Sequence, residues 1–218
     1  QWYQRRVREQ WYQRRVRGME ELSKIFAQAQ AFTQLHHKTD LAYLHDHQSL
    51  TPSFAAFYEE YCYCVVASGF KGQIAAKLAQ QLANCGGDRE KCLNIFKNKA
   101  KINAICTTFA NLHLCYQEVS QKWKSPEDLQ KLPFIGPVTC QHLARNIGLQ
   151  SCVKPDLHLK RLLKQIFGED GDEFVVGKVE ELAKKVQMNP GEVDFCLWVW
   201  LSHGKEKQKC CGSMLRLR

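Results

Sequence analysis

The sequence of 218 residues contains no apolar run close to the roughly 20 residues that a helix needs to cross a membrane. Its first residues are polar and rich in arginine, unlike the apolar stretch of a secretory signal peptide. These two absences argue against a membrane protein and against a secreted one. We therefore expect no membrane partner and a cytoplasmic location, or a nuclear one in a eukaryotic cell.

A recognisable metal-binding pattern is also missing. The 11 cysteines are scattered, and no two have the close Cys-x2-Cys spacing that iron–sulfur and many zinc sites use. The C-terminal group of Cys196, His203, Cys210 and Cys211 does not fit a standard site, and the four histidines within 36–47 lack regular ligand spacing. We expect no metal and no cofactor, and we interpret most cysteines as buried thiols in a reducing compartment.

No segment alternates apolar and polar residues over the length of a strand, so a β-sheet is not expected. Apolar residues at helical spacing instead predict an all-α chain, which is long enough for a sizeable core in one domain or two closely packed lobes. Gly/Pro breaks and capping residues divide the pattern. Predicted helices cover 23–35, 53–68, 73–83, 89–95, 99–119, 157–167, 174–186 and 192–203.

The formal net charge of +9 favours a nucleic-acid partner, but most of it comes from the N-terminus. The octapeptide QWYQRRVR occurs at 1–8 and again at 10–17, and residues 1–18 supply +5 of that charge. We interpret 1–18 as a duplicated basic extension that is an addition or is disordered, and 19–218 as the folded domain. The alternative is a basic, aromatic arm in which arginines bind phosphate and Trp or Tyr stacks on bases.

The most informative segment begins at Ser125, where a capping residue, a proline and two acids mark a helix start. The sequence LPFIGPVTC follows at 132–140. Leu132 and Ile135 are apolar anchors that would hold two helices across a turn, and Gly136 can adopt the positive φ that other residues resist. A helix starting near Pro137 would present free backbone N–H groups, which bind phosphate without a side-chain charge.

A lone aspartate follows 18 residues after Val138, within the sequence VKPDLHLKRL. Asp156 is a natural N-cap for the next helix, and this structural role is one interpretation. The functional alternative is an ionised carboxylate beside the sugar of a flipped nucleotide, where it would stabilise positive charge at C1′ as the base leaves. The cations Lys154, His158 and Arg161 would favour the ionised form and bind flanking phosphates.

At these residues the chain resembles the helix-hairpin-helix DNA glycosylase superfamily, which includes endonuclease III-like, 8-oxoguanine and 3-methyladenine enzymes. The family pattern is a Leu-Pro-Gly hairpin, an apolar helix, and a Gly/Pro-rich loop that ends in a catalytic Asp. Upstream, YCYCVVASGFKGQIAAKLAQQLA is similar to the early core helix pair of the family, and KNKAKINAICTTFA is similar to its N-x-K-A-x-x-I segment. The resemblance spans about 54–167.

This resemblance implies a two-lobed, all-α fold with the helix-hairpin-helix at about 125–148. It places Asp156 at the catalytic position, and Gly136, Val138 and Thr139 at the phosphate-binding positions of the hairpin. Family members that also cleave the strand use a hairpin lysine as a Schiff-base nucleophile, and Val138 occupies that position here. The match therefore implies a monofunctional enzyme that uses water.

Two residues depart from the family pattern. Phe134 replaces the first hairpin glycine, so the turn is expected to be distorted, or the ring to pack against DNA or a neighbouring helix. Pro137 removes one potential N–H donor. Both departures affect how the hairpin binds phosphate, and neither affects the predicted fold.

Enzymes that excise a base flip it out of the helix and commonly stack it on aromatic rings. Candidate pocket or wedge residues are Phe70, Lys71, Trp198 and Trp200, of which Phe70 and Lys71 lie in the Gly69–Gly72 break. Packing in a helical core is the alternative role for each aromatic ring. The sequence does not select the lesion.

We therefore expect a monomeric, monofunctional DNA N-glycosylase that removes a damaged or mismatched base from lesion-containing double-stranded DNA, associated with the nucleoid or the nucleus. One alternative is a non-catalytic DNA-binding module in which Asp156 only caps a helix. Another is a glycosylase/lyase that uses a different lysine, such as Lys154 or Lys160.

Overall fold

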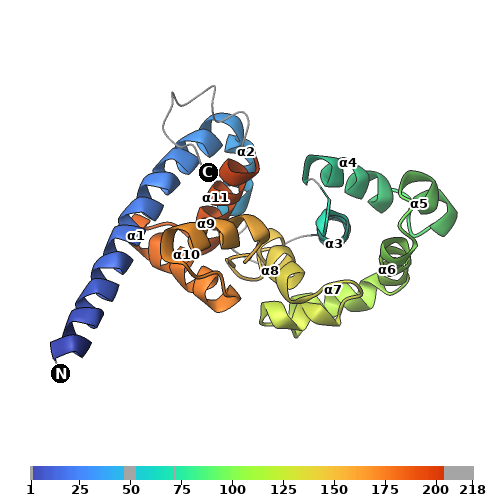
Figure 1. Ribbon diagram of the computed structural model, residues 1–218. Coiled ribbons are helices and arrows are strands. Elements are labelled where there is room, and N and C mark those ends of the chain that lie inside the picture. Colours follow the sequence, from blue (N-terminus) through green and yellow to red (C-terminus); the bar gives the residue numbers. More distant parts are fainter. Residues whose placement is uncertain (1, 47–52, 71, 204–218) are drawn as a thin grey trace. The chain divides into compact units, whose positions relative to one another are not determined.

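The computed structural model describes residues 2–46, 53–70 and 72–203 (Figure 1), and over these ranges it is helical without a strand. The all-α prediction is confirmed. No described helix combines the length and the apolar character that crossing a bilayer requires. The elements are α1 Trp2–His36, α2 Lys38–Asp46, α3 Phe54–Ala67, α4 Gly72–Ala83, α5 Arg89–Ile95, α6 Lys99–Ala110, α7 Leu112–Gln121, the 3₁₀ helix η1 Pro126–Lys131, α8 Pro137–Asn146, α9 Leu157–Phe167, α10 Asp172–Val186 and α11 Pro190–Ser202.

The chain forms two compact units, as the two-lobed fold predicts. The first comprises Gln1–His45 and Pro155–Arg218, and the second comprises Asp46–Lys154. The predicted hairpin therefore lies in the second unit, whereas Asp156 begins a helix of the first. Both units contain buried apolar residues, so each unit positions its own share of the candidate residues.

The second unit is built around the apolar helix α3, which contacts α4, α6, α7 and α8. Its fully buried residues include Tyr61, Leu129 and Leu143, so the hairpin elements share one core with α3. The single helix predicted at 99–119 is wrong, because α6 ends at Ala110 and α7 begins at Leu112. The Asn111 side chain donates a 3.0 Å hydrogen bond to the Thr107 carbonyl and so competes with the helical backbone.

The first unit packs α1 against α9, α10 and α11. Residues 2–18 form the N-terminal part of α1, so the segment expected to be an addition or disordered is helical here, and its origin stays a prediction. The Phe167 ring lies 2.4 Å from the position that a Cβ on Gly18 would occupy, so this contact requires glycine. The helix α2 was not predicted, because Leu44 is its single buried residue and gives no periodic pattern.

Candidate nucleic-acid interface

The hairpin of the second unit consists of η1, a five-residue turn and α8. Leu132 and Ile135 are 3% and 5% exposed, so the two predicted apolar anchors are confirmed as core residues. The amide of Gln141 on α8 donates a 3.1 Å hydrogen bond to the Glu127 carboxylate on η1. The turn is thus held by the burial of its apolar anchors and by a polar contact between the helices on either side of it.

The conformation of the turn differs from the expectation. The Ile135 N–H donates to the Leu132 carbonyl over 3.2 Å, and Phe134 adopts a φ of +65°. With Pro133 at the second position, this is the pattern of a type II turn, whose third position normally requires glycine. Gly136 has a φ of −99° and a ψ of −175°, so the positive φ predicted there is wrong. The turn places its third residue, not its fifth, in the left-handed region.

The N-terminus of α8 presents backbone donors without a capping side chain. Gly136 occupies the N-cap position and no side chain caps the helix. Pro137 carries no N–H, so Val138 and Thr139 supply the first amide donors. A Cβ placed on Gly136 would meet no atom within 4 Å, so the glycine leaves open space beside these amides. A phosphate oxygen can therefore approach the backbone closely.

Two buried polar side chains support the turn from α3 and α6. The Tyr61 hydroxyl donates a 2.7 Å hydrogen bond to the Pro133 carbonyl. The Lys101 ammonium donates to the carbonyls of Val66 (3.0 Å) and Ser68 (2.5 Å), and it lies 5.6 Å from the centre of the Phe134 ring. Lys101 was not predicted as a hairpin residue, because a lysine in a basic segment gives no signal that its side chain is buried.

The Asp156 carboxylate caps α9 with one of its two oxygens. Oδ1 accepts hydrogen bonds from the backbone N–H groups of His158 (2.9 Å) and Leu159 (3.1 Å). Within the described ranges, Oδ2 has no hydrogen-bond partner. The N-cap role is confirmed, and it fixes the carboxylate while leaving one oxygen available for other contacts.

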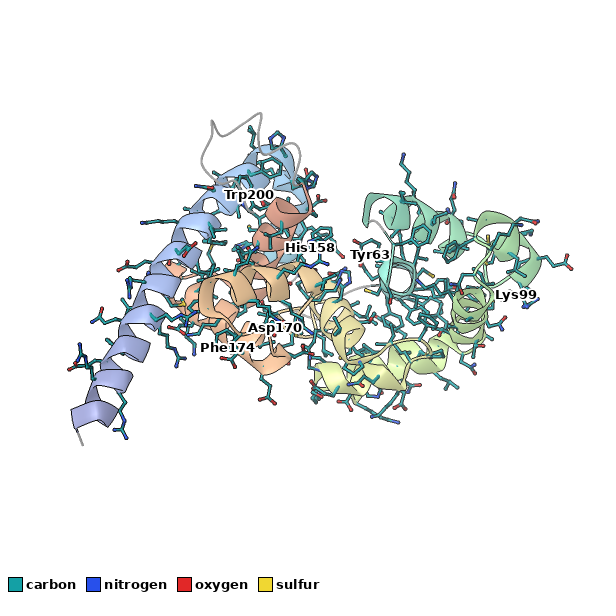
Figure 2. The ribbon with its side chains drawn as sticks, in the orientation of Figure 1. Tyr63, Lys99, His158, Asp170, Phe174 and Trp200 are labelled. Atoms are coloured by element: carbon teal, nitrogen blue, oxygen red, sulfur yellow. The ribbon has the colours of Figure 1, made fainter. Side chains whose placement is uncertain are left out.

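The predicted cations differ in their surroundings. Lys154 is half-buried in the second unit. His158 is half-buried near the start of α9 (Figure 2). Arg161 is exposed on the same helix. Lys160 pairs with Asp172, so its charge is partly neutralised. Of the three predicted cations, Arg161 is the exposed one.

The base-pocket candidates divide between the two units. Phe70 is 46% exposed in the second unit, and Lys71 lies outside the described residues. In the first unit, Trp200 is 6% exposed and packs edge-on against Phe32 at 5.5 Å, which favours a core role. Trp198 is half-buried and stacks on Phe195 at 6.3 Å.

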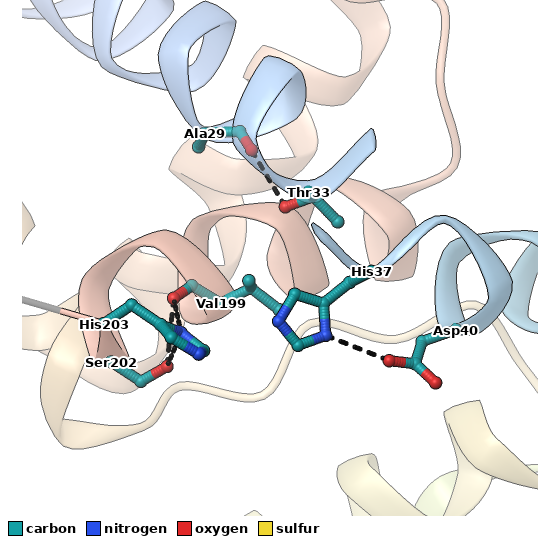
Figure 3. A network of polar contacts seen from close by, with 7 residues as sticks. All are labelled: Ala29, Thr33, His37, Asp40, Val199, Ser202 and His203. Carbon is teal, nitrogen blue, oxygen red and sulfur yellow. Dashed lines mark hydrogen bonds and ion pairs between the residues drawn. The ribbon is translucent and has the colours of Figure 1, made fainter. Parts of the chain in front are cut away.

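Histidines of the segment 36–47 contact carboxylates on both α2 and α11. His37 Nδ1 lies 3.0 Å from an Asp40 carboxylate oxygen, and His203 Nδ1 lies 2.8 Å from the Val199 carbonyl (Figure 3). Across the described part of the chain, no group of three or more His, Cys, Asp or Glu residues could hold a metal ion. His47, Cys210 and Cys211 lie outside that part.

Three solved structures share this fold. The 8-oxoguanine DNA glycosylase of Thermotoga maritima matches with a TM-score of 0.68 at 19% identity, covering 85% of this chain and 98% of that one. The 8-oxoguanine DNA glycosylase of Methanocaldococcus jannaschii matches with a TM-score of 0.66 at 16% identity, covering 85% and 95%. An 8-oxoguanine glycosylase/lyase of Methanocaldococcus jannaschii, in complex with a 15mer DNA containing 8-oxoguanine, matches with a TM-score of 0.65 at 14% identity. The match covers 90% of this chain and 100% of that one.

No family model and no curated protein sequence matches this chain. The likeness to the solved structures therefore lies in the fold. The predicted fold, that of the helical DNA glycosylases with a helix-hairpin-helix, is confirmed.

Proposed function

We propose that this protein is a monofunctional DNA N-glycosylase that removes a damaged base from duplex DNA. The observation that carries the proposal is a hairpin with open backbone amides followed, 18 residues after Val138, by a fixed carboxylate at Asp156, on a fold shared with 8-oxoguanine DNA glycosylases. The hairpin would hold the DNA backbone, and the carboxylate would face the sugar. Each residue type suits its role: amides bind phosphate without sequence preference, and a carboxylate stabilises a developing cation.

In the proposed reaction, the bond between C1′ of the deoxyribose and the base nitrogen breaks, and its electron pair leaves with the base. Positive charge develops at C1′ and on the ring oxygen, where the free Oδ2 of Asp156 would stabilise it. The oxygen of a water molecule then bonds to C1′, and the proton that this water loses is balanced by protonation of the departing base. Because Oδ1 is held by two backbone N–H groups, the carboxylate would need little reorganisation.

The substrate that we propose first is 8-oxoguanine in duplex DNA. The support is that all three similar structures are of 8-oxoguanine glycosylases, one of them bound to DNA that contains this lesion. We propose that the protein acts as a monomer, at the nucleoid or in the nucleus.

The absence of strand cleavage is the second part of the proposal. The residue at the hairpin position that carries the Schiff-base lysine in strand-cleaving relatives is Val138, whose side chain has no amine. The buried Lys101 lies near the hairpin, but its ammonium is already bound by two carbonyls. Water is therefore the nucleophile that we propose.

The test is a base-release assay on duplexes that each contain one oxidised, alkylated, deaminated or mismatched base. We expect release of 8-oxoguanine, strand breakage only after hot alkali, and no covalent adduct after borohydride treatment. Strand breakage without alkali together with a borohydride adduct would show a glycosylase/lyase. Binding to all duplexes without release of any base would show a non-catalytic DNA-binding module.

A further inference from the structure

Two exposed aromatic rings and a buried cation lie together beside the hairpin turn. The Phe134 ring is 44% exposed and Phe70 is 46% exposed, both unusual values for phenylalanine. Lys101 connects them: its ammonium lies 5.6 Å from the centre of the Phe134 ring and 6.0 Å from that of Phe96, which packs edge-on against Phe70 at 5.4 Å. All four residues belong to the second unit, so this cluster is formed within one compact part of the chain.

The conformation of Phe134 is unfavourable for a residue with a side chain. Its φ of +65° lies in the left-handed region, which glycine adopts without strain. A large ring that is nearly half exposed gains little burial energy to offset this strain. Strained residues with exposed side chains are found where function requires them, so the ring is a candidate for contact with a ligand.

The position of the ring defines what that ligand would be. Phe134 precedes Gly136 by two residues, so their Cα atoms are at most about 7 Å apart. A strand whose phosphate sits at the Val138 and Thr139 amides would therefore place its adjacent sugar and base within reach of the Phe134 ring. Apolar rings inserted beside or between bases are an established means of unstacking duplex DNA.

We propose that Phe134 and Phe70 form an aromatic contact surface for the bases next to the phosphate that the hairpin holds. Lys101 lies against the Phe134 ring and against Phe96, which in turn contacts Phe70. This inference rests on the proposed function, because it requires DNA at the hairpin. Phe134 is the principal contact, since it belongs to the turn itself. Phe70 extends the surface toward the end of α3.

The test uses two duplexes of one sequence, one with a single 8-oxoguanine and one undamaged, each with 2-aminopurine beside the central position. Binding is measured by anisotropy over a range of salt concentrations, and unstacking is measured by the 2-aminopurine fluorescence. The variants are Phe134→Gly, Phe134→Ala and Phe70→Ala. The matched control is Leu114→Ala, which removes an apolar side chain that is 64% exposed on α7 of the same unit.

Loss of one base-stacking contact is expected to weaken binding about tenfold for both Phe134 variants. The increase in 2-aminopurine fluorescence that the wild type causes should disappear. The slope of affinity against salt should stay unchanged, because no phosphate contact is lost. Phe70→Ala should have a smaller effect of the same kind, and Leu114→Ala should have none.

Affinity and fluorescence equal to the wild type in both Phe134 variants would overturn the inference and leave the glycosylase proposal intact. A reduced salt slope in these variants would also overturn it, because the ring would then only position the hairpin amides. A wild type that binds neither duplex would overturn the proposed function and this inference together.

Discussion

The hydroxyl of Tyr61 donates a 2.7 Å hydrogen bond to the carbonyl of Pro133, which joins the central helix of the second unit to the hairpin turn. Burial raises the pKa of the Tyr61 hydroxyl, so it remains a neutral donor at physiological pH. The turn that precedes the backbone amides of Val138 and Thr139 is thereby fixed to a fully buried residue. The geometry of the proposed DNA contact depends on this bond.

Tyr61→Phe is expected to lower the free energy of unfolding by about 1 kcal/mol, because it leaves a carbonyl at the turn without its donor. DNA affinity should fall with it. The matched control is Tyr58→Phe, which removes a 3.2 Å bond to the Ile105 carbonyl, away from the hairpin. Urea denaturation and anisotropy measure the two effects. Equal DNA affinity in the two variants would contradict the role of Tyr61.

Replacing Phe134 should separate folding stability from DNA binding. Phe134→Gly removes the ring and relieves the left-handed strain, whereas Phe134→Ala removes the ring and keeps the strain. We expect the glycine variant to be more stable than the alanine variant by about 1 kcal/mol in urea denaturation. An alanine variant at least as stable as the glycine variant would show that the turn does not adopt a positive φ in solution.

His142 is expected to make stability depend on pH. This histidine of α8 is buried against Tyr63, and its pKa is lowered well below 6.5 by burial and by the nearby charges of Lys154 and Arg145. Below pH 6.5 the unfolded chain binds a proton on His142 that the folded chain does not. The contribution of His142 to the free energy of unfolding is therefore fully present above that pH and is lost as the pH falls.

The slope of the free energy of unfolding against pH that His142 alone can cause is at most about 1.4 kcal/mol per pH unit. His142→Phe should flatten the pH dependence of the free energy of unfolding between pH 5 and about 6.5, as measured by urea denaturation. An unchanged slope in that variant would assign the pH dependence to other groups.

Lys101 acts as a C-terminal cap for α3, because its ammonium binds two carbonyls at the end of that helix. Lys101→Met keeps the aliphatic chain and removes these bonds, so we expect a loss of about 1 to 2 kcal/mol in the free energy of unfolding. Lys99→Met is the control, since Lys99 is exposed on α6, the helix that also carries Lys101 (Figure 2). Equal thermal stability of the two variants in an unfolding scan would refute the capping role of Lys101.

Local signals predicted the parts of the fold that depend on neighbouring residues. The bounds of α5 and α9 match the prediction, because Asp88 and Asp156 cap them and a glycine ends α9. The hairpin anchors followed from their spacing and apolar character. The N-cap role of Asp156 was likewise visible in the sequence.

Other features depend on tertiary context and could not be predicted. The positive φ falls on Phe134 because the turn begins at Leu132, a register that the core sets through the burial of Leu132 and Ile135. The burial of Lys101 requires the end of α3, which lies more than 30 residues away in the sequence. Neither feature leaves a local pattern.

The most direct test of the proposed chemistry is single-turnover release of 8-oxoguanine by the wild type, Asp156→Asn and Asp156→Ala. Asparagine retains the N-cap, whereas alanine removes it and should cost about 1 kcal/mol of stability. Asp88→Ala, which removes a cap of the same geometry on α5, is the control for folding effects.

We predict that Asp156→Asn folds as stably as the wild type and binds the lesion duplex, but releases base at least 100-fold more slowly, as expected for a lost transition-state charge. Asp88→Ala should release base at the wild-type rate. Base release by Asp156→Asn at the wild-type rate would contradict the account, because the carboxylate would then serve only as a helix cap.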